Sequence, residues 1–151
     1  MRIALASDHA GFAEKERLKP LLSDLGIEFE DLGTTSEESV DYPDYAARVA
    51  RAVADGSAQQ GLLVCGSGTG MAMTANKVPG VRAALCTDAY TADGARRWND
   101  ANVLALSLRL TSEPLLKEIL DAWFAASASE DAEDRANVER VGRLDLGRST
   151  H

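Results

Sequence analysis

A cysteine beside a glycine-rich turn is the part of the sequence best suited to chemistry. Residues 61–70 read GLLVCGSGTG, in which an apolar run ends at Cys65 and Gly66, Gly68 and Gly70 alternate with hydroxyl residues. Glycines allow successive backbone N–H groups to converge on one point, as in anion-binding loops. Those N–H groups are expected to stabilise a thiolate and to lower the pKa of Cys65 from about 8.5. The turn therefore predicts a small anion, or a developing oxyanion, beside a reactive thiol.

Two nucleotide-binding motifs resemble this turn, but the sequence lacks residues that each of them requires. A dinucleotide fingerprint, G-x-G-x-x-G, would need glycine where Met71 stands, although Asp88 lies at a suitable distance for a ribose-binding acid. A phosphate loop of the NTPase type would need Lys and Ser or Thr after Gly70, and Met71 and Ala72 occupy those positions. What remains is an anion site with an adjacent thiol, acting either as an enzyme or as a binding module.

The pattern of apolar runs predicts the elements that must position this turn. Strands are expected over 2–7, 27–32, 62–65, 81–86 and 102–107, and helices over 12–25, 42–55, 71–76, 89–99 and 113–124. Alternating strands and helices with short loops predict a three-layer α/β/α fold with a five-stranded parallel sheet. Ligands bind such sheets beyond the carboxyl ends of the strands. That edge would carry Asp8, His9, the glycine turn and Arg109, with His9 either a ligand or a structural residue.

The chain reads as a single domain, 1–151, with a C-terminal arm over about 127–151. Ser127 and Glu130 match a capping box, which predicts a last helix from about 129 to 144. Its apolar content is thin, so this helix either reaches a partner subunit or is a solvated tail.

Composition narrows the classes of partner and compartment. A net charge of −8 argues against nucleic acid or anionic membranes as partners. No apolar run reaches the roughly 20 residues that span a bilayer. Two cysteines are too few for a disulfide framework, which favours a cytoplasmic protein, and Cys86 is expected to be a core residue.

Five motifs in order resemble one known family, the ribose-5-phosphate isomerase B and galactose-6-phosphate isomerase family. The resemblance covers residues 1 to about 124 and implies a Rossmann-like fold, no metal or organic cofactor, and a homodimer or tetramer with shared active sites. The motifs are Ser-Asp-His-Ala-Gly (7–11), Asp-Tyr-Pro-Asp-Tyr-Ala (41–46), Cys-Gly-Ser-Gly-Thr-Gly (65–70), Ala-Asn-Lys (75–77) with Gly-Val-Arg-Ala (80–83), and Asn-Asp-Ala-Asn-Val-Leu (99–104).

The resemblance implies an aldose–ketose isomerase of a small phosphorylated sugar, ribose 5-phosphate above all. Cys65 would move a proton between C1 and C2 through a cis-enediolate, Ser67 would assist at the oxygens, and Asn99 of the other subunit would steady the enediolate. The implied substrate-binding residues are Asp8 and Tyr42 for the sugar, the N–H groups of Gly66, Gly68 and Gly70 for the oxyanion, and His9, Arg109 and Arg140 for the phosphate.

Two departures from the family pattern bear on the substrate. Trp98 stands where the family commonly has a histidine credited with opening the sugar ring. Ala136 and Asn137 replace an Arg-His pair in the tail, and Arg135, one position earlier, is a candidate substitute. A tetrose 4-phosphate cannot form the usual five-membered ring, because its O4 carries the phosphate. The alternative substrates are therefore a four-carbon sugar phosphate such as erythrulose 4-phosphate, or a hexose 6-phosphate. An inactive subunit of a hetero-oligomer is a further alternative.

Overall fold

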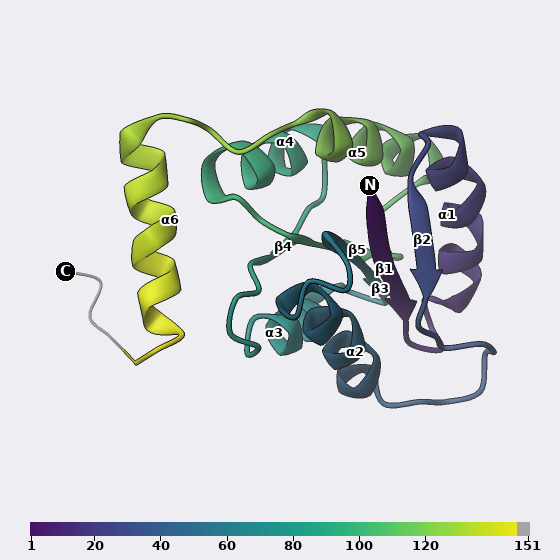
Figure 1. Cartoon of the computed structure of the whole chain (residues 1–151). Helices are drawn as coiled ribbons and strands as arrows, with labels where there is room; N and C mark the ends of the chain where they lie inside the picture. The colour runs from purple at the N-terminus through teal and green to yellow at the C-terminus, as the bar shows by residue number, and fades with distance from the viewer. Residues whose placement is uncertain (148–151) are drawn as a thin grey trace.

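The computed structural model describes residues 1–147, over which strands and helices alternate as the sequence predicts (Figure 1). The strands are β1 (Arg2–Ser7), β2 (Glu28–Asp31), β3 (Gln60–Cys65), β4 (Ala83–Leu85) and β5 (Val103–Ser107). The helices are α1 (Phe12–Asp24), α2 (Tyr42–Ala54), α3 (Thr69–Ala75), α4 (Ala89–Asn99), α5 (Glu113–Ala125) and α6 (Ala132–Leu144).

The five strands form one parallel sheet in the order β2-β1-β3-β5-β4. This confirms the predicted Rossmann-like α/β fold. The chain leaves β1 toward β2 on one side and returns to β3 on the other, so the strand order reverses between β1 and β3. Ser7 of β1 pairs with Val64 of β3. The loops that follow these two strands therefore leave the sheet side by side, at the position where ligands bind in such folds.

Alternate residues of each strand enter two separate cores, one on each face of the sheet. Ile3, Leu62 and Leu104 pack under α1, α4 and α5, whereas Ala4, Leu63 and Ala105 pack under α2 and α3. Figure 1 shows α4 and α5 on one side of the strands and α2 and α3 on the other. Cys65 belongs to the α2/α3 core, which fixes the face on which its thiol lies.

Several predicted boundaries are wrong by one to three residues: β3 and α3 each begin two residues earlier than predicted, and two further differences have a clear cause. β4 is shorter than the predicted 81–86. The Arg82 N–H donates to the Asn102 side chain at 2.7 Å, and therefore not to the backbone of a neighbouring strand. The last helix begins at Ala132, and its N-cap is Asp131 instead of a Ser127 capping box. The Asp131 carboxylate accepts hydrogen bonds from two N–H groups of the first turn, which accounts for its place at the cap.

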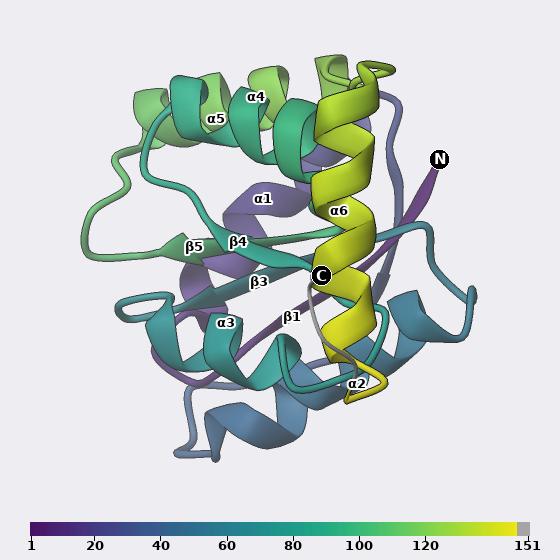
Figure 2. The same ribbon diagram turned by 90° about the vertical axis from the view of Figure 1, so that its left-hand side faces the viewer.

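Helix α6 stands apart from the sheet in Figure 1, and in Figure 2 it lies in front of the strands. Its ends are tied down: the Ser129 N–H donates to the Arg97 carbonyl at 2.7 Å, and the Gly80 N–H donates to Asp145 Oδ2 at 2.8 Å. Within residues 1–147, however, none of the side chains of α6 is buried. Across that same range, no helix has both the length and the apolar character needed to cross a membrane.

Candidate active site

The thiol of Cys65 lies at the end of β3, where the strand gives way to the glycine turn. Cys65 is 5% exposed, and its Sγ accepts a hydrogen bond from the Gly68 N–H at 3.2 Å. Gly68 has φ +79°, and a Cβ there would lie 2.5 Å from Leu85 Cδ1 and 3.1 Å from the Leu106 backbone. Glycine is thus required at residue 68 both for its backbone angle and for space. This lets the turn fold back onto the thiol.

Burial raises the pKa of the Cys65 thiol, and this effect is the largest one acting on it. Hydrogen bonds from the backbone at Met71, Gly68 and Ser67 oppose the shift, while the negative charge of Asp8 adds to it. The predicted lowering of the pKa is therefore wrong, because the desolvation of the thiolate outweighs the N–H groups of the turn. A raised pKa keeps Cys65 protonated at neutral pH and makes its thiolate a stronger base.

Ser67 lies at the open side of the turn, with its Oγ 2.7 Å from Thr69 Oγ1. The Thr69 N–H also points at Ser67 Oγ, at 3.4 Å. Both residues border a hollow of about 560 Å³ that Arg109 and the backbone of Gly66 also line. The structure therefore brings Ser67, Gly66 and Arg109 of one chain together, as the sequence predicts.

Asp8 and His9 follow β1 and lie next to the end of β3. The Asp8 carboxylate accepts a hydrogen bond from the Gly11 N–H at 2.9 Å. A Cβ on Gly11 would lie 2.5 Å from the Val64 carbonyl oxygen, so glycine allows the two strand ends to approach. His9 Nδ1 accepts a hydrogen bond from the Val40 N–H at 3.0 Å. The Val40 carbonyl oxygen also lies 3.2 Å from Nδ1. When Nδ1 accepts from the Val40 N–H, Nε2 carries the proton and can donate to an anion.

The ring of Tyr42 packs directly against the glycine turn. A Cβ on Gly70 would lie 2.5 Å from Tyr42 Cε1, which places the first residue of α2 over the first turn of α3. Tyr42 is 43% exposed, so its ring is in contact with the turn and with solvent at once. Asp8, His9, Tyr42 and the glycine turn therefore form one continuous edge, which we call the thiol edge (residues 8, 9, 42 and 65–70).

The remaining predicted residues lie elsewhere in the chain, on α4 and α6. Trp98 and Asn99 line a cavity of about 450 Å³ together with Val138 of α6. Arg135 borders a second cavity, of about 460 Å³, that Trp98 also lines. Arg140 is exposed on α6. Within residues 1–147, none of Trp98, Asn99 and Arg135 borders the hollow beside Ser67.

Two hydroxyls absent from the predicted site support the glycine turn. Ser107 Oγ donates to the Gly66 carbonyl at 2.9 Å and accepts from the Leu110 N–H at 3.2 Å. The second is Thr69, whose Oγ1 is hydrogen-bonded to Ser67 Oγ. The only sequence signal for Ser107 is that a polar residue ends an apolar strand, which does not say which backbone group it binds. Over residues 1–147, no group of three or more His, Cys, Asp or Glu side chains is placed to hold a metal ion.

Comparison with known proteins gives consistent matches along most of the chain. The model of the Ribose/Galactose Isomerase family matches residues 3–142. Ribose-5-phosphate isomerase B of Escherichia coli is 40% identical over 148 residues, covering 98% of this chain and 99% of the relative. D-erythrulose-4-phosphate isomerase of Pectobacterium atrosepticum is 40% identical over 144 residues, 94% of this chain and 93% of the relative.

Solved structures agree with the sequence comparison. Ribose-5-phosphate isomerase B of Clostridium thermocellum superposes with a TM-score of 0.94 at 40% identity, covering 97% of this chain and 99% of that structure. A family model spans nearly the whole chain, and relatives of 40% identity match over nearly their full length. The chain therefore belongs to the ribose/galactose isomerase family and is an aldose–ketose isomerase.

Proposed function

We propose that this chain interconverts ribose 5-phosphate and ribulose 5-phosphate, with Cys65 as the base. The observation that carries the proposal is the position of Cys65 Sγ: it lies at the point where the strand order reverses, under the glycine turn and near Asp8. The relative named ribose-5-phosphate isomerase B, identical at 40% of positions, supports this substrate.

In the proposed reaction, the Cys65 thiolate removes the proton from C2 of the open-chain aldose. The electron pair moves into a C1–C2 double bond, and the carbonyl oxygen O1 becomes the oxyanion of a cis-enediolate. The proton on Sγ is returned to C1, and Ser67 Oγ carries the hydroxyl proton from O2 to O1. Backbone N–H groups of the glycine turn stabilise the enediolate oxygen. Asp8 and Tyr42 hold the sugar, while His9 and Arg109 hold the phosphate.

The partner half of the site is proposed to come from a second copy of the chain. Asn99 would steady the enediolate, and Arg135 and Arg140 would add to the phosphate grip. Asn99 and Arg135 border cavities between α4 and α6, apart from the hollow beside Ser67. The exposed side chains of α6 support a homodimer in which these residues face the thiol edge of the other copy.

The experiment replaces Cys65 by serine and follows exchange of the C2 proton of ribose 5-phosphate with deuterated solvent. A general base contributes roughly 10²–10⁴-fold, so exchange should fall at least about 100-fold while ribose 5-phosphate still binds. The matched control is Cys86→Ala, because Cys86 is also buried but belongs to the opposite core. Exchange that survives in Cys65→Ser would disprove the role of the thiol.

A second candidate substrate is a tetrose 4-phosphate. Trp98 in place of a ring-opening histidine favours it, as does the relative named D-erythrulose-4-phosphate isomerase at 40% identity. Values of kcat/KM for ribose 5-phosphate, allose 6-phosphate and erythrulose 4-phosphate decide between them. If the enzyme prefers erythrulose 4-phosphate, that compound replaces ribose 5-phosphate as the proposed substrate. In that case Trp98→His should gain activity on the ring-forming sugars.

A further inference from the structure

Lys15 of α1 is a charged side chain without a role in the proposed reaction, and it is completely buried. Its side chain is 0% exposed. Its Nζ donates to Asp31 Oδ1 at 2.6 Å, to Asp31 Oδ2 at 2.7 Å and to the Thr34 carbonyl at 2.6 Å. An ammonium group is costly to remove from water, and complete pairing only offsets that cost. A nonpolar side chain of this size would fill the same space without that cost. The groups that the ammonium binds therefore indicate what it does in the structure.

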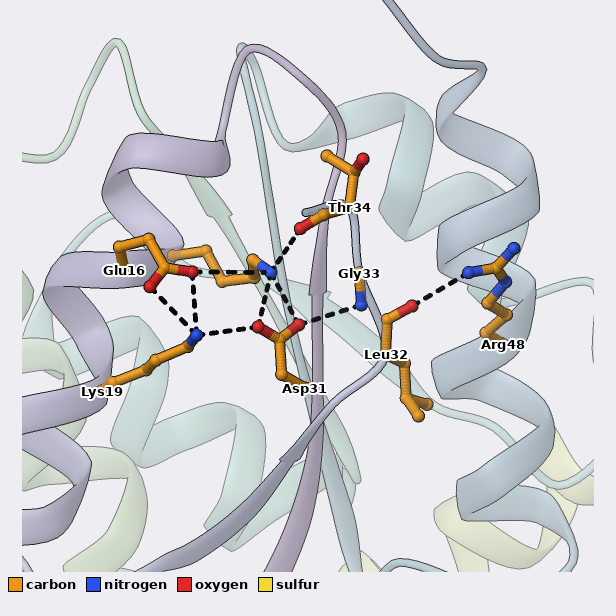
Figure 3. Close-up of polar contacts among 8 residues, drawn as sticks. Glu16, Lys19, Asp31, Leu32, Gly33, Thr34 and Arg48 are labelled. Atoms are coloured by element: carbon orange, nitrogen blue, oxygen red, sulfur yellow. Dashed lines mark hydrogen bonds and ion pairs between the residues drawn. The ribbon is translucent and has the colours of Figure 1, made fainter. Parts of the chain in front are cut away.

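The ammonium holds the segment that follows β2. Asp31 ends β2, and its Oδ1 also accepts from the Gly33 N–H at 2.9 Å. Lys19 lies one turn later on α1. Its Nζ forms ion pairs with Asp31 Oδ2 and with Glu16 Oε1, each at 2.8 Å (Figure 3). Burial alone would raise the pKa of Asp31, but hydrogen bonds from the two lysines and from Gly33 hold it below its ordinary value. The carboxylate is therefore charged and shared between α1 and the loop.

The same segment is fixed from its other side by α2. Arg48 Nη1 donates to the Leu32 carbonyl at 3.0 Å (Figure 3), and the Arg48 guanidinium stacks 4.4 Å from the ring centre of Tyr45. A Cβ on Gly33 would lie 2.7 Å from Tyr45 Cε1, so the loop backbone packs directly on that ring. Residues 31–34 are thus held between two helices.

This segment is hydrogen-bonded to the end of β1, directly before the thiol edge. The Ser7 N–H donates to the Gly33 carbonyl at 2.8 Å, and the Thr34 N–H donates to the Ser7 carbonyl at 3.0 Å. Ser7 is the residue directly before Asp8 and His9. Farther along the same loop, the Val40 N–H binds His9 Nδ1, and Tyr42 follows two residues later. The segment that Lys15 holds therefore fixes Ser7, two residues before His9. It also begins the loop whose Val40 binds the His9 ring.

We propose that Lys15, acting through Asp31 and the Thr34 carbonyl, is a positioning residue that sets the placement of Asp8 and His9 for substrate binding. The proposal rests on the isomerase function proposed above. Within residues 1–147, the hydrogen bonds of the Lys15 ammonium go to Asp31 and Thr34, which lie outside the thiol edge. Cys65 is held separately by β3 and the glycine turn. Loss of the ammonium should therefore weaken substrate binding more than the proton-transfer step.

The test compares Lys15→Met with Lys19→Met. Both lysines pair with Asp31, but only Lys15 also binds Thr34. We expect Lys15→Met to raise KM for the sugar phosphate about tenfold with kcat changed less than about threefold, and Lys19→Met to leave both within about twofold. Equal kinetic effects of the two variants would overturn the positioning role.

A double variant separates positioning from simple loss of stability. Lys15→Met/Asp31→Asn removes both charges and keeps a side-chain oxygen for the Gly33 N–H and Lys19. It should fold even where Lys15→Met does not, because replacing both partners of an ion pair is better tolerated than removing one. We expect a melting temperature close to wild type with KM still raised about tenfold. A double variant that recovers both the melting temperature and the wild-type KM would overturn the proposal.

One further readout needs no turnover and so separates this proposal from the proposed function. His9 is one of only two histidines, so its ring resonances are readily assigned by NMR. In the free enzyme they should shift in Lys15→Met and in the double variant, and remain in place in Lys19→Met. Unshifted His9 resonances count against the positioning role. A wild-type enzyme without isomerase activity on any of the three sugar phosphates counts against the proposed function instead.

Discussion

At the scale of single residues, the protonation of Cys65 decides how the site works. Its thiol is buried beside the negative charge of Asp8, and both raise its pKa, burial being the larger effect. A base with a raised pKa is a strong proton acceptor, but only a small fraction of the enzyme carries it at neutral pH. Cys86 shows the same effect without a glycine turn, since burial raises its pKa to about 11. The turn at Cys65 therefore moderates desolvation instead of reversing it.

The pH dependence of Cys65 reactivity tests this account. In a Cys86→Ala background, the alkylation rate of Cys65 should rise with pH through a midpoint above about 8.5, the ordinary thiol value. Asp8→Asn removes a negative charge that raises the pKa, so the midpoint should move to lower pH. A midpoint below the ordinary value, or an Asp8→Asn shift to higher pH, would contradict this assignment.

Gly68 gives a second residue-scale prediction. An alanine there adopts φ +79° and meets Leu85 and the Leu106 backbone, whereas an alanine at Gly80 adopts φ +87° in open space. Gly80→Ala should therefore cost only the conformational strain, about 1–2 kcal/mol of unfolding free energy. Gly68→Ala should cost more and also lower kcat, because the turn carries the N–H that meets the thiol. Denaturant unfolding and steady-state kinetics measure both, and equal stabilities of the two variants would disprove the steric part.

At the scale of elements, the site depends on how loops are fixed to neighbouring helices. The loop after β2 is joined to α1 through Asp31, Lys15 and Lys19, and to α2 through Arg48. The loop after β5 is joined to the glycine turn through Ser107. Lys15, Arg48 and Ser107 each donate from a helix or strand to a carbonyl of loop backbone, so the rigid elements define where the loops lie.

The Asp31 links predict part of the acid stability of the protein. The folded pKa of Asp31 lies below its unfolded value of about 3.9, so its contribution is fully present above that value and is lost as pH falls through the folded pKa. Asp31→Asn should therefore lower stability at neutral pH and flatten its decline below about pH 4. Asp93→Asn is the control, since Asp93 pairs with Arg97 on an exposed surface where solvent screens the charges. Thermal melts across this pH range should show a clearly larger effect for Asp31.

At the scale of the whole molecule, α4 and α6 together present large apolar side chains to solvent. Trp98 and Tyr90 of α4 and Val141 and Leu144 of α6 are between 42% and 71% exposed, and Trp98, Val141 and Leu144 line the same cavity. Tyr90 and Trp98 pack edge to face, with ring centres 5.8 Å apart. The Trp98 ring lies against Gly94, where a Cβ would be 2.5 Å from Trp98 Cζ3. Contiguous apolar surface of this kind marks protein–protein contact sites, which supports the proposed dimer.

The dimer can be tested with charges placed on α6. Val141→Asp/Leu144→Asp should shift the mass measured by light scattering from dimer to monomer and lower kcat/KM by at least about tenfold, because half of each proposed site is lost. Glu133→Gln, a charge change on the same exposed helix, should leave both unchanged. Circular dichroism should remain native in both variants, since within residues 1–147 α6 contributes no buried side chain. A dimeric, fully active double-aspartate variant would contradict the proposed interface.

The sequence by itself determined the α/β architecture and the thiol beside its glycine turn. Both follow from local patterns: the period of apolar residues, and glycines next to a cysteine. Tertiary structure alone decided the direction of the Cys65 pKa, the contact between Tyr42 and Gly70, and the burial of Lys15 under the loop of Asp31 and Thr34. Each of these depends on how segments that are far apart in the sequence pack together, which local patterns do not specify. A lysine within a polar helix looks like a surface residue until the sheet edge packs over it.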